Sequence, residues 1–286
     1  MKKFSCLLFA VVIAFSVSAQ AINVMTFNIR YNNPSDGDNA WPYRRNNVAN
    51  QVLFHDVNIL GVQEALHDQV MDLKERLTKF NYVGVGRDDG KEAGEYSAIF
   101  YDTTRLKLLH TETFWLSEQP NVPGSKSWDA AITRIVTWAE FKDRKTKKKF
   151  FVFNTHFDHI GKKARAESAR IILEKAKEIA GKKLVIVTGD FNSTPSDDPY
   201  KIITDVNNPD KLTDSKTVCV TPHYGPTGTF NDFKSKETSN EPIDYIFVKG
   251  KVRVLKHATL SQSWQGHFSS DHFPVFARLS FKRLSV

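Results

Sequence analysis

Short polar motifs stand at the ends of apolar runs along almost the whole chain. They read VMTFNIR (24–30), LGVQEA (60–65), FVFNTHFDH (151–159), LVIVTGDFNSTP (184–195), IDYIFV (243–248) and SDHFPVFA (270–277). If the runs are neighbouring buried strands, these polar ends converge. The converging residues would be Asn28, Glu64, His156, Asp190, Asn192, Asp244, Asp271 and His272. Carboxylate and amide oxygens bind hard divalent cations, and imidazoles bind phosphoryl oxygens. The motifs together predict a metal and phosphate site.

Glu64 and Asn28 are the candidates for the metal side of this site. A carboxylate after the short apolar run 59–63 can bind Mg²⁺ or Mn²⁺ through oxygen while the ion keeps several waters. The alternative is an acidic residue at a helix N-terminus, where the helix dipole favours it. Asn is unfavourable inside a strand, and a buried amide needs partners. Asn28 could therefore hold Glu64 or a metal-bound water, or it could be a structural amide.

Asp190 and Asn192 follow a buried run and lie two residues apart. In extended geometry their side chains share a face, because side chains alternate along a strand. A carboxylate and an amide aimed at one point can orient a water and bind a phosphoryl oxygen. The alternative is an Asx turn, since GDFNSTP is also good turn chemistry.

Two histidines could act together with acidic partners. His156 ends an apolar run, where it could donate to a phosphate oxygen or move a proton, or simply be a core histidine. Glu95, at the start of a predicted strand, is the candidate that orients it. Asp244 is the candidate partner of His272, because a buried carboxylate fixes the imidazole tautomer and favours the charged form. Asp271 is expected on the metal side.

The periodicity predicts three helices and ten strands. Some strands alternate with the helices, and others follow one another directly. Helical spacing is predicted for 43–56, 65–80 and 162–180, the last ending at Gly181. Strands are predicted at 22–30, 57–63, 96–101, 106–116, 132–142, 150–156, 184–189, 243–249, 252–260 and 273–281. Residues 84–94 and 206–242 are predicted to be loops, because they are rich in turn-forming residues. This mixture predicts a layered α/β protein with mixed sheets.

Composition favours one globular domain after an export signal. The chain has 286 residues, 41% of them hydrophobic, and no linker or repeat. Lys2 and Lys3 precede an apolar stretch, 7–15, and a small-residue cleavage site, 17–19, which is typical of a secretory signal peptide rather than a spanning helix. A retained anchor is the alternative. We expect residues 1–19 to be removed, residues 20–286 to form the domain, and the product to be periplasmic or extracellular.

Charge and cysteine content narrow the function only slightly. The formal charge of +8 suits an anionic substrate, and loss of Lys2 and Lys3 would lower it by two. A lysine cluster at 145–149 is predicted to be a solvated hairpin turn. Cys219 would be the single cysteine of the exported product, which excludes an intramolecular disulfide. We expect no stable membrane anchor and no obligate protein partner.

Over about residues 22–281 the motifs resemble the endonuclease/exonuclease/phosphatase superfamily, which has the deoxyribonuclease I-like fold. The resemblance implies a four-layer sandwich, with two mixed β-sheets packed together and helices outside. It implies Glu64 as the principal metal ligand, supported by Asn28 and completed by Asp271. It also implies that Asp190 activates the water, that Asn192 contacts the phosphate, and that His156 with Glu95 and His272 with Asp244 form two histidine–acid pairs.

Further segments, YNNPSDGDNAWPYRR (31–45), GEYSAIFYD (94–102), SWDAAITR (127–134) and THFDHIGKKAR (155–165), resemble secreted members of unassigned substrate. Within them, Arg134 could contact phosphate or be a surface charge. Trp41, Trp128 and His159 could line the substrate cleft, or the two tryptophans could be packing aromatics.

The expected function is that of a secreted Mg²⁺- or Mn²⁺-dependent phosphoesterase. A phosphodiester is the favoured substrate, in DNA, RNA, or a small or lipid-linked molecule. A phosphomonoester is the alternative within the same mechanism. A non-catalytic module that binds a phosphorylated ligand is the alternative of another class.

Overall fold

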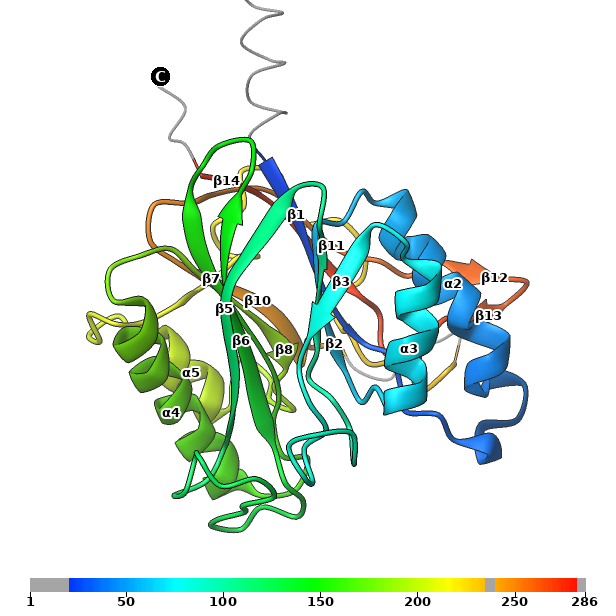
Figure 1. Cartoon of the computed structure of the whole chain (residues 1–286), viewed down its shortest axis with the longest axis horizontal. Coiled ribbons are helices and arrows are strands. Elements are labelled where there is room, and N and C mark those ends of the chain that lie inside the picture. Colours follow the sequence, from blue (N-terminus) through cyan, green and yellow to red (C-terminus); the bar gives the residue numbers. More distant parts are fainter. Residues whose placement is uncertain (1–20, 235–239, 282–286) are drawn as a thin grey trace, which may run out of the picture.

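The computed structural model describes residues 21–234 and 240–281, and the predicted signal peptide lies outside them. Two six-stranded sheets form the centre of the molecule (Figure 1). In spatial order the first sheet contains β11 (Arg253–Thr259), β14 (Val275–Ser280), β1 (Ala21–Asn28), β2 (Ile59–Gln63), β4 (Ile99–Asp102) and β3 (Phe80–Val83). The second contains β5 (Leu106–Trp115), β6 (Ile135–Asp143), β7 (Lys149–His156), β8 (Val185–Asp190), β10 (Asp244–Lys249) and β9 (Thr213–Asp214).

Helices cover the outer face of each sheet. They are the 3-10 helix η1 (Pro34–Asn39) and the α-helices α2 (Trp41–Phe54), α3 (His67–Arg76), α4 (Lys162–Ala180) and α5 (Asp198–Thr204). Figure 1 shows α2 and α3 on one side and α4 and α5 on the other. A small hairpin of β12 (Ser263–Trp264) and β13 (His267–Phe268) lies near α2. No helix of the described ranges is long and apolar enough to cross a membrane.

Three separate apolar cores hold these four layers together. One lies between α2, α3 and the first sheet, one between the two sheets, and one between the second sheet and α4 and α5. On α4, Ala169, Ile172, Leu173 and Ala176 recur at helical spacing and are buried, which explains why this helix docks on the sheet. The predicted four-layer sandwich of two mixed sheets is confirmed.

Both sheets are mixed, and each has one parallel pair near its centre. β1 runs parallel to β2, and β7 runs parallel to β8, while the other pairings are antiparallel. The carboxyl ends of the two parallel pairs carry the polar motifs. Open α/β sheets commonly bind ligands just beyond the carboxyl ends of their strands.

The observed elements differ from the predicted ones mainly at their ends. α4 has the predicted bounds, and Gly181 ends it with φ 58°, a conformation that glycine adopts readily. The helix predicted at 65–80 is shorter, because Phe80–Val83 instead pairs with β4 as a strand. The strand predicted at 96–101 begins at Ile99. The loop 206–242 contains only the short strand β9 among its described residues.

A buried polar network joins the two sheets. Asn154 on β7 donates to the backbone oxygens of Val62 at 2.8 Å and Ala98 at 2.9 Å, and it accepts from Gln63 and Thr188. All four hydrogen-bonding positions of this amide are therefore used. Opposite it, Gly61 has no room for a side chain.

A Cβ at Gly61 would lie 2.4 Å from Oγ1 of Thr188 and 2.5 Å from Oδ1 of Asn154. The close approach of the sheets at this point thus requires glycine.

Replacing Asn154 with leucine is expected to lower the free energy of unfolding by about 3–5 kcal/mol, since each buried polar group left without a partner costs about 1–3 kcal/mol. Chemical denaturation of the variant beside the parent protein measures this difference. Asn121→Ala, at an exposed loop position, is the control and should change stability little. Equal stability of Asn154→Leu and the parent would contradict the role given to the network.

A second polar contact joins a buried and a half-buried histidine away from the polar motifs. Nδ1 of His257 on β11 lies 2.9 Å from Nδ1 of His223, whose Nε2 donates to the backbone oxygen of Pro226 at 3.0 Å. Burial, with a smaller contribution from His223 and Lys216, lowers the pKa of His257 to about 3. His257 therefore stays neutral in the folded protein at mildly acidic pH.

Acid is expected to destabilise the protein through this pair. The unfolded chain binds a proton on His257 near pH 6.5, but the folded protein does so only near pH 3. The free energy of unfolding should therefore fall as the pH drops below 6.5, by about 1.4 kcal/mol per pH unit for this one group. Denaturation at pH 7, 6 and 5 should give a shallower pH slope for His257→Gln than for the parent. His110→Gln, at an exposed position on β5, should keep the parental slope, and parallel slopes for His257→Gln would refute the prediction.

Candidate active site

The carboxyl ends of the two parallel strand pairs meet at one cavity. Asn28 pairs in register with Gln63, the residue before Glu64, and His156 pairs with Asp190. Asp244 lies opposite Asp190 in the antiparallel pair of β8 and β10. β14 runs antiparallel to β1, so the residues just before it also reach this edge. The topology thus brings together the eight polar residues predicted to converge.

A strained turn after β1 positions Glu64. Arg30 has φ 55° and Glu64 has φ 62°, which is uncommon for residues other than glycine. The backbone N–H of Tyr31 donates to Oε2 of Glu64 at 3.2 Å, and Nδ2 of Asn28 donates to Oε1 at 3.0 Å. Two donors therefore fix both carboxylate oxygens of Glu64.

Asn28 donates to two carboxylates of the site. Its Nδ2 also donates to Oδ2 of Asp190 at 3.0 Å, and its Oδ1 accepts the backbone N–H of Arg30 at 3.0 Å. These contacts agree with the expectation that Asn28 holds Glu64, and its role as a metal ligand stays a prediction. Asn28 joins Glu64 of the first sheet to Asp190 of the second.

Asp190 lies at the centre of the site. Burial, followed by the nearby charge of Asp244, raises the pKa of the Asp190 carboxyl to about 7. Its Oδ1 accepts the backbone N–H of Asn192 at 2.9 Å, and its Oδ2 lies 3.4 Å from Nε2 of His156 and 3.8 Å from Nε2 of His272. A carboxylate with a pKa near neutrality can accept a proton from a water and release it again.

His272 and Asp244 form the predicted histidine–acid contact. Oδ2 of Asp244 lies 2.9 Å from Nδ1 of His272. Burial opposes the charged imidazole, but the adjoining carboxylates of Asp244 and Asp190 raise the pKa of His272 well above its ordinary value. Phe230 packs edge-on against the ring at 5.1 Å between centroids. His272 is therefore a fixed imidazolium.

His156 is neutral and lacks its expected partner. Burial and the charge of Arg134 lower the pKa of His156 well below its ordinary value. The predicted pair with Glu95 is wrong, because Glu95 binds Arg87 at 2.6 Å and Nδ1 of His156 has no hydrogen-bond partner within the described part of the chain. Nε2 of His156 lies 3.0 Å from Nδ2 of Asn192.

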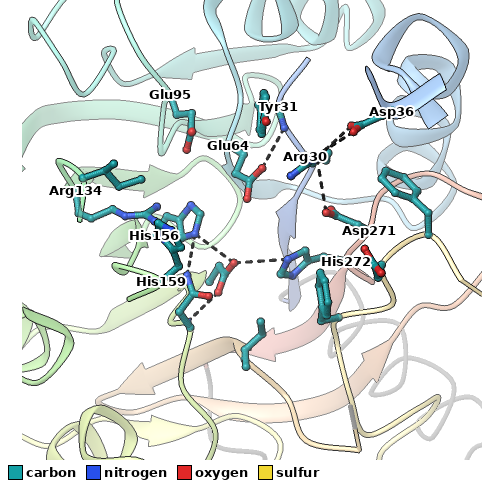
Figure 2. A pocket seen from close by; sticks show the side chains of 17 residues that line it. Arg30, Tyr31, Asp36, Glu64, Glu95, Arg134, His156, His159, Asp271 and His272 are labelled. Carbon is teal, nitrogen blue, oxygen red and sulfur yellow. Dashed lines mark hydrogen bonds and ion pairs between the residues drawn. The ribbon is translucent and has the colours of Figure 1, made fainter. Parts of the chain in front are cut away.

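The cavity enclosed by these groups has a volume of about 550 Å³. Figure 2 shows its walls, with Arg134 and His159 on one side and Arg30, Asp36 and Asp271 on the other. The side chains that line it are those of Arg30, Tyr31, Asp36, Glu64, Glu95, Ile132, Arg134, His156, His159, Asp190, Asn192, Phe230, Asp232, Phe233, Ile243, Asp271 and His272.

Two residues predicted to line the cleft do not line the cavity, and several residues that do line it were not predicted. Trp41 is 1% exposed in the α2 core and donates from its ring nitrogen to Asp72, so its predicted place in the cleft is wrong. Trp128 also does not line the cavity. Arg30, Tyr31 and the segment 230–233 do line it but were not predicted. The positive φ of Arg30 depends on distant contacts, and 230–233 carries no periodic signal.

The oxygen ligands near Glu64 fit a divalent cation. Asp271 faces Glu64 across the cavity, and burial together with the charge of Glu64 raises the pKa of Asp271 although His272 opposes this. A cation between the two carboxylates would relieve this repulsion. Elsewhere among the described residues, Asp190, Asp244 and His272 form a compact group, with ligand atoms within 4.8 Å of one another. It fits a cation less well, because a protonated imidazole has no lone pair to offer.

Comparisons with known proteins agree with this geometry. A sequence profile of the Endonuclease/Exonuclease/phosphatase family matches residues 25–272. An endonuclease/exonuclease/phosphatase structure from Bacteroides vulgatus is 42% identical, covers 92% of this chain and 99% of its own, and has a TM-score of 0.88. A mannosyl-6-phosphatase from Bacteroides thetaiotaomicron is 40% identical, with coverages of 91% and 100% and a TM-score of 0.85.

A more distant relative is Protein angel of Drosophila melanogaster, 27% identical over 178 residues. The match covers 59% of this chain and 48% of that protein, so the chain spans about half the length of this relative. The profile match extends over most of the chain and includes the cavity residues from Arg30 to His272. The chain therefore belongs to the endonuclease/exonuclease/phosphatase family.

Proposed function

We propose that this protein is an exported, divalent-metal-dependent phosphatase that hydrolyses a small phosphomonoester, with a sugar phosphate as the substrate class. The observation that carries the proposal is the convergence of a carboxylate pair, a carboxyl group with a pKa near 7 and two histidines of opposite charge state in one cavity. A catalytic site needs such groups with contrasting pKa values, whereas a site that only binds does not.

Glu64 and Asp271 are the residues that would hold the cation. When bound, Mg²⁺ or Mn²⁺ would neutralise phosphoryl charge and lower the pKa of a water. Asp190 receives a proton from the attacking water. The Asp190 carboxylate itself is held in place by Asn28 and by the backbone N–H of Asn192. The imidazolium of His272 donates to a phosphoryl oxygen, where negative charge grows in the transition state. Nδ2 of Asn192 donates to the backbone oxygen of Phe157 and contacts Nε2 of His156, both at 3.0 Å, and so holds His156 at the edge of the cavity.

The walls of the cavity favour a small neutral leaving group over a nucleic acid. Six carboxylates and two arginines line the cavity, so its walls are acidic although the whole chain is basic. A long polyanion requires a basic surface along its path. A volume of about 550 Å³ suits a small molecule. Asp36, Asp232 and Phe233 on one wall offer carboxylates and an apolar face, groups that bind sugar hydroxyls and ring carbons.

The named relative supports the same substrate class. The mannosyl-6-phosphatase from Bacteroides thetaiotaomicron aligns over 91% of this chain at 40% identity. The expectation of a phosphodiester substrate has no comparable support, because it rests on the resemblance at superfamily level. Export is proposed because residues 1–19 have the pattern of a secretory signal peptide.

A substrate panel tests the proposal. Mannose 6-phosphate, glucose 6-phosphate, a methyl phosphodiester and single-stranded DNA are incubated with the protein in Mg²⁺, Mn²⁺ or EDTA. Phosphate release from a sugar phosphate, lost in EDTA, is the expected result. Cleavage of DNA with a steep salt dependence would instead establish a nuclease. Binding of a sugar phosphate without turnover in any metal would establish the non-catalytic module.

A further inference from the structure

Arg134 is a buried cation at the wall of the cavity, not the surface charge considered as its alternative. It follows the loop before β6 and is 5% exposed. Its Nη2 contacts Nδ1 of His159 at 3.2 Å, while its Nε and Nη1 have no hydrogen-bond partner within the described residues. A guanidinium has five N–H donors, and burying them without acceptors is costly.

The carboxylates around Arg134 are already occupied. Glu95 attracts Arg134 most strongly but makes its direct contact with Arg87, at 2.6 Å. Asp158 lies 3.8 Å from Nε of Arg134, yet its oxygens accept four backbone N–H groups, those of Ala131, Ile132, Ile160 and Gly161. Arg134 therefore has no closely bound anion of its own, which is unusual for a buried charge.

Arg134 lies on the side of the cavity where a phosphoryl oxygen of the substrate would point. Figure 2 shows the guanidinium beside His156, on the side of the cavity opposite Asp271 and Arg30. His156 in turn contacts Asn192 and Asp190. A phosphoryl group between Glu64 and Asn192 would have one oxygen facing the metal side and another facing His156 and Arg134. A terminal phosphoryl carries a charged oxygen in that direction, whereas a diester can carry an ester group there.

We propose that Arg134 binds a non-bridging oxygen of the terminal phosphoryl group and so makes the site selective for dianionic phosphomonoesters over monoanionic diesters. This specificity role rests on the proposed phosphatase function. Charge-assisted contacts from arginine to phosphoryl oxygens are strong. The Nε and Nη1 atoms of Arg134 are fully buried, so a phosphoryl oxygen would be bound through Nη2, which now contacts His159. Selectivity then comes from the second negative charge of the monoester.

Two substrates with the same leaving group test this role. The kcat/KM for p-nitrophenyl phosphate and for methyl p-nitrophenyl phosphate is measured in the metal-loaded parent protein, Arg134→Gln, Arg134→Lys and Arg170→Gln. Arg170 lies on α4 in an exposed ion pair with Glu167 and loses the same charge away from the cavity. In Arg134→Gln the monoester value should fall about 30- to 1,000-fold, as when one partner of a buried charged contact is removed, and the diester value less than about 5-fold. Arg134→Lys should recover part of the lost monoester activity. Arg170→Gln should keep the parental kcat/KM on both substrates.

A binding measurement separates this role from a structural one. Inorganic phosphate should raise the Tm of the parent protein and of Arg170→Gln. The rise in Tm should be much smaller for Arg134→Gln. The Tm of Arg134→Gln without phosphate should not fall, because the arginine makes no close ion pair. If Arg134→Gln does not fold, both the kcat/KM comparison and the Tm measurement are made with Arg134→Lys.

Equal losses on the two esters, or no loss on either, would overturn the inference. A parent protein that hydrolyses no monoester would instead overturn the proposed function, before any variant is compared.

Discussion

Glu64→Gln is expected to remove metal-dependent hydrolysis almost completely while the protein stays folded. Glutamine keeps the length of the side chain and can still accept the backbone N–H of Tyr31, but it loses the charge that a divalent cation requires. A bound cation contributes several kcal/mol of charge stabilisation to the transition state. A loss of about 4 kcal/mol corresponds to roughly a 1,000-fold fall in rate, and we expect at least that.

Two readouts check this expectation. Steady-state hydrolysis of a sugar phosphate gives the rate, and titration calorimetry with Mn²⁺ gives metal affinity independently of turnover. Glu112→Gln, at an exposed position on β5, should match the parent protein in both. If Glu64→Gln bound Mn²⁺ as tightly as the parent does, the metal would have to be held elsewhere, and within the described ranges Asp190, Asp244 and His272 form a compact group that could hold it.

Asp244→Asn is expected to have the second largest effect, a fall in kcat of about 100- to 10,000-fold, the range seen when a histidine loses its orienting carboxylate. Asp244 is buried and contacts Nδ1 of His272 at 2.9 Å. It is the largest of the influences that raise the pKa of His272. Without it, burial favours the neutral imidazole, which cannot offset phosphoryl charge as the imidazolium does.

The pH dependence of kcat shows whether charge is the cause. In the parent protein the carboxylates of Asp244 and Asp190 raise the pKa of His272 well above 6.5, so its contribution persists above that pH. In Asp244→Asn the contribution should disappear at a lower pH than in the parent protein, because the largest influence that raises the pKa of His272 is gone and only Asp190 and Asp271 still raise it. Asp198→Asn, an exposed change on α5, should keep the parental profile. A uniform fall at every pH would mean that Asp244 only orients the ring.

Much of the architecture could be predicted because local patterns determine it. The spacing of Ala169, Ile172, Leu173 and Ala176 and the stop at Gly181 gave α4 its observed bounds. Apolar runs of five to eight residues marked β1, β2, β7 and β8, and three of the polar residues at their ends, Glu64, His156 and Asp190, line one cavity. A strand end is visible in a sequence because hydrophobic burial stops there.

The missed features depend on contacts between distant parts of the chain. Glu95 could not be assigned to Arg87 rather than His156, since all three reach the same region only after folding. Trp41 resembled a cleft aromatic, but its environment is set by packing of α2 against α3. Phe230 and Phe233 lie in an irregular loop whose path is fixed by contacts such as the backbone bonds from Asn231 to Asp271 and from Phe273 to Thr229.

The place of β14 in the first sheet has a consequence for folding. β14 lies between β11 and β1, and Asp271 and His272 come just before it. One edge of β1 therefore stays open until residues 275–280 pair with it. The polar groups at the end of β1 and in the segment before β14 can be aligned only once this pairing of distant parts of the chain has formed. In a refolding experiment, hydrolytic activity should accordingly return together with the native sheet and not before it, which makes activity a reporter of completed folding.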